Sequence, residues 1–363
     1  MSKLSCGIVG LPNVGKSTLF NALTKQGASS QNFPFCTIEP NVGIVDLEDP
    51  RLAKLSEISK SSRIVPAAVT FVDIAGLVAG ASKGEGLGNK FLANIRETDA
   101  IVHVVRCFES DDIVHVAGRV DPLADIEVIE TELMLADLQM AENVIAKLEK
   151  QVKGDKRLAG PLATLKSVAA KLGEGSVVSS LELSEEESIH LAPYPFLTAK
   201  RCIYACNVAE SDIARGNAYV EKVRTYAATR GDQVVIISAQ IEEELATLSD
   251  EEALDYLKEL GLEQTGLARL IRASFDALGL LTFFTTGEME TRAWTIERGT
   301  RAPQAAGKIH TDIERGFIRA EVVTYDDFIT CGGRARAKEV GKVRLEGKTY
   351  EVADGDVILF YHN

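Results

Sequence analysis

Gly10-Leu11-Pro12-Asn13-Val14-Gly15-Lys16-Ser17-Thr18 is the stretch of sequence that decides the fold. An apolar run at residues 6–9 leads into it, and a helical pattern at residues 19–23 leads out of it. The pattern G-x-x-x-x-G-K-[ST] between a strand and a helix is typical of the P-loop, where backbone N–H groups and a helix N-terminus surround phosphate oxygens. The sequence therefore predicts a nucleotide-binding loop formed by these residues: Pro12, Asn13, Val14, Gly15, Lys16, Ser17 and Thr18.

Two side chains of this loop have predicted roles in hydrolysis. Lys16 is expected to contact the β- and γ-phosphates as a catalytic residue, and the Ser17 hydroxyl is expected to bind Mg²⁺. The alternative is a glycine-rich turn that binds no ligand. Four fixed positions in a strand–loop–helix setting rarely arise by chance, so the P-loop interpretation is favoured.

The composition is that of a globular protein. A chain of 363 residues with 45% apolar and 26% charged residues is long enough for two or three domains. No apolar run approaches the ~20 residues of a membrane span, so we expect a cytoplasmic protein without membrane contact. Six cysteines without a C-x-x-C pair make a zinc or disulfide framework unexpected.

The net charge of −13 argues against a protein that is polybasic throughout, but the charge is unevenly spread. Residues 281–363 carry 12 basic and 13 acidic side chains, whereas the preceding 280 residues carry 28 and 40. The C-terminal part is therefore the less acidic part of the chain.

Two further segments are expected to complete the phosphate and Mg²⁺ site. Thr37, in the proline- and aromatic-containing residues 32–40, is the candidate second Mg²⁺ ligand. The D-x-x-G motif at the end of an apolar strand places Asp73 to orient a Mg²⁺-bound water and the Gly76 N–H to contact the γ-phosphate. Leu77 follows where Ras-type enzymes carry a water-positioning Gln, so the usual catalytic side chain is missing. Four glycines behind it predict a second switch segment: Gly80, Gly84, Gly86 and Gly88.

Two histidines are candidates for the missing water-positioning side chain. His115 lies beyond the carboxyl end of a strand at residues 101–107, the edge at which such sheets bind ligands, and it could position the attacking water. The other interpretation, a surface loop histidine, stays open. His103 lies inside the strand and is predicted to be a core residue.

A change of pattern marks an inserted segment. Apolar residues recur at three- and four-residue steps over residues 125–152, a break follows at residues 153–155, and a second helical pattern begins at Pro161. Ser184 with Glu187 resembles a capping box that starts a third helix. We predict a mainly antiparallel helical hairpin that acts as a partner-contacting lever.

The ends of two later strands are expected to read the base, at the positions where P-loop GTPases carry N-K-x-D and S-A-K. Asn207 can pair with an adenine edge through both amide atoms. Val208 cannot reproduce the lysine stem, and Glu210 is one methylene longer than the aspartate that binds guanine. With the Ser238 and Ala239 backbone these residues form the predicted base site, and ATP is expected to bind more tightly than GTP.

In these motifs the chain resembles the YchF family, the Obg-related ATPases of the translation-factor class of P-loop proteins. The resemblance spans essentially the whole chain and rests on the P-loop, residues 32–41, the D-x-x-G-L run with residues 84–88, and Asn207 with Glu210. The last pair discriminates, because true Obg GTPases keep N-K-x-D. The resemblance implies Mg²⁺-dependent ATP hydrolysis and association with ribosomes.

The resemblance also implies an α/β fold with three domains. A Ras-like P-loop domain is expected at residues 1–125 and 200–278, an inserted α-helical hairpin at 126–199, and a C-terminal TGS domain of β-grasp form at 279–363. Within that last domain the patterns predict strands and one helix: strands at 282–287, 290–296 and 354–360, and a helix at 305–313. Seven basic side chains there either contact rRNA phosphates or form an ordinary solvated face: Arg315, Arg319, Arg334, Arg336, Lys338, Lys342 and Arg344.

The sequence thus predicts a monomeric, slowly hydrolysing Mg²⁺·ATP switch whose γ-phosphate orders two loops and changes a surface presented to the ribosome, through the 50S subunit and its rRNA. A further hypothesis is that Asn13 helps to bind K⁺ in place of an arginine finger. Two alternatives remain. One is an Obg-type GTPase in ribosome assembly with relaxed base specificity, and the other is a binding protein whose fold the nucleotide merely stabilises.

Overall fold

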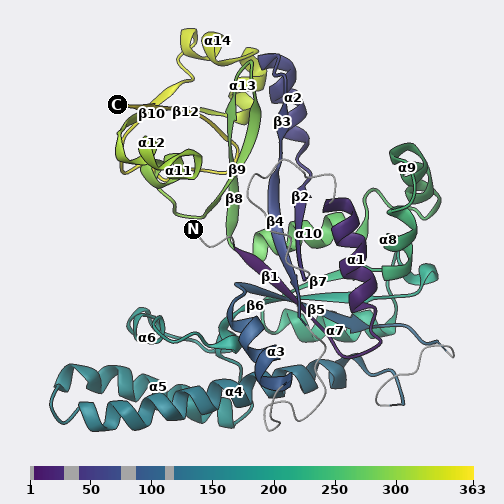
Figure 1. Ribbon diagram of the computed structural model, residues 1–363, viewed down its shortest axis with the longest axis vertical. Coiled ribbons are helices and arrows are strands. Elements are labelled where there is room, and N and C mark those ends of the chain that lie inside the picture. Colours follow the sequence, from purple (N-terminus) through teal and green to yellow (C-terminus); the bar gives the residue numbers. More distant parts are fainter. Residues whose placement is uncertain (1–3, 28–40, 75–86, 111–117) are drawn as a thin grey trace. The chain divides into compact units, whose positions relative to one another are not determined.

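The structure is a computed structural model (Figure 1). The residues that it describes, to which all structural statements below refer, are 4–27, 41–74, 87–110 and 118–363.

The chain divides into two compact units. The first comprises residues 1–43 and 70–273, and the second comprises residues 44–69 and 274–363. Residues 44–69 thus group with the C-terminal segment, although the resemblance assigned them to the nucleotide domain. The three-domain division itself stays a prediction.

A six-stranded sheet in the order β2-β4-β1-β5-β6-β7 carries the P-loop. β1 runs parallel to β4 and β5, and β5, β6 and β7 are parallel in turn. Every residue of β1 and β5 is buried, as expected for apolar strands covered on both faces. The strand bounds are Ser5–Val9 (β1), Val42–Leu47 (β2), Ala67–Asp73 (β4), Ala100–Arg106 (β5), Arg201–Asn207 (β6) and Gln233–Ile237 (β7).

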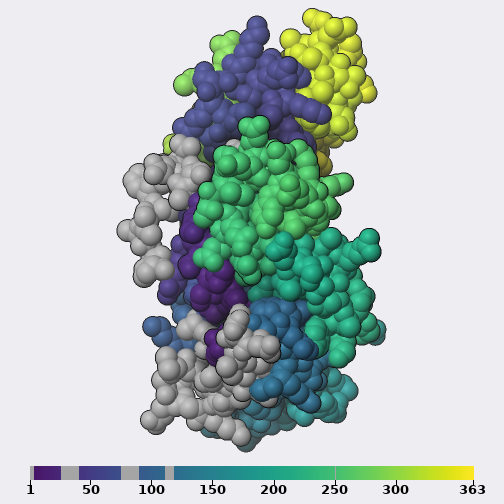
Figure 2. All heavy atoms as spheres, turned by 90° about the vertical axis from the view of Figure 1, so that its right-hand side faces the viewer, coloured from purple at the N-terminus to yellow at the C-terminus, as the bar shows by residue number. Residues whose placement is uncertain are grey.

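Helices flank this sheet. α1, which follows the P-loop, packs against α8, and the purple N-terminal atoms lie against green atoms of later residues in Figure 2. The strand predicted at residues 101–107 is confirmed within one residue at each end. The helix bounds are Lys16–Gly27 (α1), Leu87–Arg96 (α3), Ala218–Ala228 (α7), Ala239–Leu245 (α8), Asp250–Glu259 (α9) and Gly266–Ala277 (α10).

The predicted helical hairpin is present. α4 (Pro122–Gln151) begins at an N-cap, Asp121, whose side chain accepts from the Ala124 N–H, with proline at the first helical position. α5 (Ala159–Gly173) packs back on it through an apolar cluster. α6 (Glu185–Leu191) carries the predicted capping box. No helix in the described part of the chain is both long and apolar enough to cross a membrane.

Two carboxylates anchor the root of this hairpin. Asp137 of α4 is 1% exposed and accepts from the Leu197 and Thr198 N–H groups, each at 2.8 Å, and from the Thr198 hydroxyl at 2.7 Å. Leu197 and Thr198 belong to the segment that returns the chain to the sheet. The hairpin is therefore held at its root by hydrogen bonds that fix its direction as well as by apolar packing.

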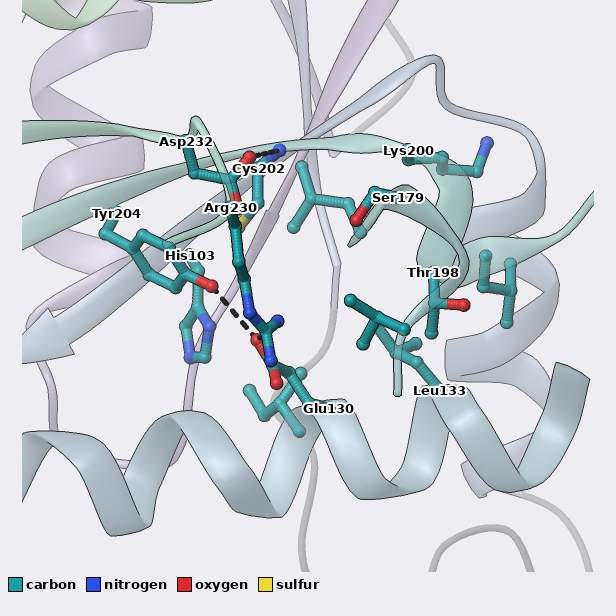
Figure 3. Close-up of a pocket in the computed structure, with 14 residues that line it drawn as sticks. His103, Glu130, Leu133, Ser179, Thr198, Lys200, Cys202, Tyr204, Arg230 and Asp232 are labelled. Atoms are coloured by element: carbon teal, nitrogen blue, oxygen red, sulfur yellow. Dashed lines mark hydrogen bonds and ion pairs between the residues drawn. The ribbon is translucent and has the colours of Figure 1, made fainter. Parts of the chain in front are cut away.

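Glu130, also on α4, makes the second anchor. Its carboxylate accepts from Tyr204 Oη of β6 at 3.0 Å, Tyr226 Oη of α7 at 2.6 Å and Arg230 Nη1 at 2.5 Å. Figure 3 shows the Arg230 guanidinium and the Tyr204 hydroxyl pointing at this carboxylate. These three residues and Lys200 line the same pocket. Because Tyr204 lies in β6, the hairpin is tied directly to the sheet.

The second unit contains a mixed sheet in the order β11-β10-β12-β8-β9-β3. β12 pairs in parallel with β8, and antiparallel partners, β10 and β9, lie outside this central pair. α11 packs its alanines into the core beside this sheet, which is the β-grasp arrangement that was predicted. The strand bounds are Ile64–Val65 (β3), Leu280–Thr286 (β8), Thr291–Glu297 (β9), Phe317–Thr324 (β10), Arg344–Glu346 (β11) and Asp356–His362 (β12).

One element of this unit was predicted wrongly. The helix expected at residues 305–313 is two helices, because His310 adopts an extended backbone and caps the second with its ring nitrogen, which accepts from the Asp312 N–H. The sequence pattern alone does not distinguish such an internal cap from a helical residue. The helix bounds are Pro50–Ser59 (α2), Ala302–Ile309 (α11), Thr311–Arg315 (α12), Tyr325–Cys331 (α13) and Arg334–Glu339 (α14).

Candidate functional site

The P-loop connects β1 to α1 through a tight backbone turn. Asn13 and Gly15 both have positive φ, at 63° and 92°. A Cβ at Gly15 would lie 2.3 Å from the Asn207 amide nitrogen, and a Cβ at Gly10 would lie 2.9 Å from the Val104 carbonyl oxygen. Glycine is therefore required at both ends of the loop. Gly15 is needed for its positive φ and for lack of space, and Gly10 for lack of space alone.

Lys16 and Asp73 lie together at the centre of the site. The parallel register of β1 and β4 pairs Ile8 with Asp73, which brings the end of β4 beside the start of the P-loop. The Lys16 ammonium forms an ion pair with the Asp73 carboxylate. Lys16 is 9% exposed. The residue predicted to hold phosphate and the residue predicted to orient a Mg²⁺-bound water are thus in direct contact.

The same region offers oxygen donors of the kind that Mg²⁺ prefers. Asp73 supplies a carboxylate at the carboxyl end of β4, and Ser17 presents an exposed hydroxyl at the first turn of α1. Hard oxygen ligands that leave positions for water and phosphate suit Mg²⁺. The residues present therefore fit this ion.

Asn207 links the P-loop to the predicted base site. Its amide nitrogen donates to the Val14 carbonyl oxygen at 2.9 Å, and its amide oxygen accepts from the Ala239 N–H at 2.9 Å. The side chain is 5% exposed. One amide hydrogen and one oxygen lone pair remain beyond these bonds. The adenine contact predicted for Asn207 would have to use this remaining hydrogen and lone pair, because the other amide hydrogen and the other lone pair already bond to the backbone.

The other residues of the predicted base site lie around Asn207. Glu210 is exposed at the start of a short 3₁₀ turn, and Ser238 and Ala239 form the buried start of α8. Val208 is 2% exposed and packs into the apolar core, so its side chain does not line a base-binding surface. The place of Val208 in the base site stays a prediction.

Three predicted site residues lie outside the described residues: Thr37, Gly76 and His115. Leu77, where the usual Gln is missing, and the predicted switch glycines Gly80, Gly84 and Gly86 lie outside them too. The prediction for His103 is confirmed, because it is 2% exposed within β5. Burial lowers the pKa of His103 to about 3, so the imidazole is neutral at physiological pH.

Sequence reasoning missed Glu242. This side chain of α8 is 1% exposed and accepts from the Gly266 N–H at 2.7 Å, at the first residue of α10. The signal was present, since Ala239, Glu242 and Leu245 recur at three-residue steps on the buried face of α8. Burial raises the pKa of Glu242 to about 7, against the lowering effect of backbone hydrogen bonds.

This raised pKa predicts a stability that depends on pH. The pKa of Glu242 is about 7 in the folded protein and 4.5 in the free side chain. The protonated carboxyl therefore makes its full contribution to the unfolding free energy below pH 4.5, and this contribution is lost as the pH rises through 7. We expect the Glu242→Gln variant, which cannot ionise, to gain about 3 kcal/mol in unfolding free energy relative to wild type between pH 5 and 8. Urea unfolding across this range measures the difference. Parallel profiles would contradict the prediction, and exposed Glu243→Gln is the control.

Comparisons with known proteins agree with this geometry. Residues 5–145 match a family model described as 50S ribosome-binding GTPase. Residues 280–363 match the model of the YchF GTPase C-terminal domain, described as a protein of unknown function.

Similar proteins span the full length of the chain. The ribosome-binding ATPase YchF of Haemophilus influenzae is 57% identical over 359 residues, and that of Bacillus subtilis is 52% identical over 363 residues, with 99% of each chain covered in both cases. The solved structure of the Schizosaccharomyces pombe YchF GTPase shares 37% identity with a TM-score of 0.89, and covers 99% of this chain and 98% of that chain. A GTP binding protein of Pyrococcus horikoshii, at 19% identity, TM-score 0.64 and coverage of 99% and 100%, is alike in fold.

Proposed function

Because this chain belongs to the YchF family of ribosome-binding ATPases, we propose that it is a Mg²⁺-dependent ATPase that binds the ribosome and switches between nucleotide-bound states. The observation that carries the proposal is the contact of Lys16 with Asp73 beneath a P-loop that Asn207 braces. These side chains come from three separate segments and meet at the carboxyl ends of parallel strands. The carboxyl ends of parallel strands are the edge at which such sheets bind ligands, so this arrangement fits a nucleotide site.

The mechanism follows from these positions. Lys16 exchanges its partner, Asp73, for the β- and γ-phosphates of the nucleotide, while the P-loop N–H groups bind the remaining oxygens. With Lys16 moved away, Asp73 and the Ser17 hydroxyl would be the residues that hold Mg²⁺, Asp73 through a water molecule. The ion, when bound, neutralises charge that develops on the phosphates. We further propose that Thr37 is a Mg²⁺ ligand, that the Gly76 N–H donates a hydrogen bond to the γ-phosphate, and that His115 positions the attacking water.

We propose that the base preference is for ATP. Glu210 supports this, since a longer carboxylate replaces the aspartate that accepts from guanine in N-K-x-D proteins. The alternative is a GTPase of Obg type in ribosome assembly with relaxed base specificity. It draws on the names of the family model and of the fission yeast structure, which both say GTPase.

A single variant tests the base preference. We expect wild type to bind a non-hydrolysable ATP analogue more tightly than its GTP counterpart. We also expect Glu210→Asp to shift the ratio of the two dissociation constants towards GTP by about tenfold, or about 1.4 kcal/mol. Glu210 is exposed, so the fold is unaffected, and Glu243→Asp on α8 is the matched control. Calorimetry with Mg²⁺ present measures both. Tighter binding of the GTP analogue by wild type would contradict the ATP preference and favour the Obg-type GTPase alternative.

The loop also leads us to propose a monovalent cation. Asn13 is exposed with a positive φ, in a G-x-P-N-V-G-K-S loop like those of GTPases in which K⁺ replaces an arginine finger. Turnover is therefore expected to be higher in KCl than in NaCl at equal ionic strength. Steady-state phosphate release measures this, and equal rates would remove K⁺ from the mechanism.

The partner proposed for the switch is the ribosome, through the 50S subunit and its rRNA, with the protein acting as a monomer in the cytoplasm. Cosedimentation of wild type with purified ribosomes and separated subunits, with the ATP analogue and without it, tests this part. Absence from every ribosomal fraction in both states would overturn it.

A further inference from the structure

A pocket lies at the root of the helical hairpin, between α4 and the sheet (Figure 3). Ile101 and His103 of β5 line it, because alternate residues of a strand face the same side of the sheet. Their partners in the parallel register, Cys202 and Tyr204 of β6, line it as well. The pocket thus contacts the first part of β6, whereas Asn207 of the base site is the last residue of that strand.

Four polar side chains of the pocket keep hydrogen-bonding capacity. The His103 ring nitrogen Nε2 is buried and has no hydrogen-bond partner among the described residues. Arg230 donates to Glu130 through Nη1, and its other N–H groups bond to no described residue. The Asp232 carboxylate accepts from one backbone N–H of β6 at 3.3 Å and has further lone pairs. The hydroxyl of Ser179, in the short helix Val178–Ser180, bonds to no described group.

A hydroxyl group suits all four of these side chains. The guanidinium only donates, the carboxylate only accepts, and the ring nitrogen of a neutral imidazole does one or the other according to its tautomer. A hydroxyl group or a water molecule donates and accepts at once. The pocket also has no formal charge, since Arg230 and Lys200 balance Glu130 and Asp232. A neutral ligand is therefore favoured over an ion.

The size of the pocket limits the ligand. The volume is about 30 Å³. One water molecule needs about 10–15 Å³ of such space, so the pocket holds two of them side by side. A ligand that displaces ordered water must reproduce its hydrogen bonds, and two neighbouring hydroxyl groups do so. Ile129, Leu133 and Leu197 add apolar walls that the CH groups of such a ligand can contact.

We propose that this pocket binds a short neutral polyol through two neighbouring hydroxyl groups, a vicinal diol. The hydroxyl groups accept from Arg230 and donate to Asp232, and they also bond to Ser179 and to His103 Nε2. Figure 3 shows Arg230 and Ser179 on opposite sides of the pocket, so a ligand between them contacts the sheet side and the hairpin side together.

The test titrates wild-type protein that carries isotope-labelled histidine with glycerol and follows the ring nitrogens by NMR. The His103 signals are expected to shift with a dissociation constant of about 10 mM, which suits a ligand of this size. They are identified by their loss in His103→Phe and by their constancy across the physiological pH range, since burial lowers the pKa of His103 to about 3. Trimethylene glycol, whose hydroxyl groups are not neighbours, is expected to bind at least about tenfold more weakly.

Two variants test the contacts themselves. Asp232→Asn replaces an acceptor with a donor and is expected to weaken glycerol binding at least about tenfold, and Ser179→Ala about fivefold. Burial raises the pKa of Asp232, so a neutral amide is tolerated at this position and the fold is kept. Ser180→Ala is the matched control for Ser179→Ala, because Ser180 is adjacent in sequence but does not line the pocket. Its affinity for glycerol should equal that of wild type.

The proposal is overturned if the His103 signals stay unshifted at glycerol concentrations well above this dissociation constant, which would leave water as the occupant. Parallel shifts of all histidine signals would overturn it too, since they report a change of solvent. Equal affinities for glycerol and trimethylene glycol, or equal losses in Ser180→Ala and Ser179→Ala, would have the same consequence. The titration needs neither nucleotide nor ribosome, so its outcome is independent of the proposed function.

Discussion

Replacing Lys16 with alanine is expected to lower the rate of ATP hydrolysis by about 10³-fold. Among the described residues, the Lys16 ammonium of the P-loop is the cation that pairs with Asp73 at the end of β4. It is expected to stabilise charge on the transferring phosphoryl group. Its loss also leaves Asp73 without its ion-pair partner. The fold should survive, because Asp73 keeps part of its side chain, 22%, exposed to water. Single-turnover phosphate release with saturating Mg²⁺·ATP measures the chemical step directly.

The matched control for this prediction is Lys25→Ala. Lys25 is an exposed lysine of the same helix, in its last turn, and its replacement should leave the rate unchanged. Lys16→Arg keeps the charge but not the compact ammonium geometry, and is expected to recover little activity. A Lys16→Ala rate within threefold of wild type would show that the phosphates are held by other groups and would remove Lys16 from the mechanism.

Replacing Asn207 with alanine is expected to weaken the binding of both ATP and GTP, by about 10²-fold each. The amide joins the P-loop to the start of α8, and alanine leaves the Val14 carbonyl and the Ala239 N–H without their partner. Each buried group left unpaired costs about 1–3 kcal/mol, so the two together cost the loop about 2–6 kcal/mol of support. Calorimetric titration with both analogues measures the affinities, and thermal unfolding without nucleotide reports the loss of support.

The ratio of the two affinities separates two roles of Asn207. Equal losses for ATP and GTP show that the amide acts by bracing the P-loop, whereas a larger loss for ATP shows that it also contacts adenine. The exposed Asn143→Ala change on α4 is the control for amide removal as such. Unchanged binding of both nucleotides would contradict the bracing role. A loss of ATP binding in this variant is therefore not by itself a sign of adenine recognition.

Much of the fold was predictable because its signals are local. The P-loop, the strand that ends at Asp73 and the capping box at Ser184 each depend on residues within a few positions of one another, and the structure has all three. The continuous apolar runs of β1 and β5 likewise identify strands covered on both faces. The helices α8, α13 and α14 and the strand β10 were not predicted, since short or mixed patterns carry little periodic signal. The longer helices α2, α9 and α10 were missed as well.

The sequence by itself determined which chemistry the chain carries: a lysine, a hydroxyl and a carboxylate at P-loop spacing, on an α/β framework with an inserted hairpin. Only the tertiary structure decided what those polar groups contact. Asn207 meets Val14 across 193 positions of sequence, and the burial of Glu242 depends on α10, which follows it by 24. Periodicity states which face of an element is apolar, whereas the partner of a buried polar atom depends on which distant backbone the fold brings to it.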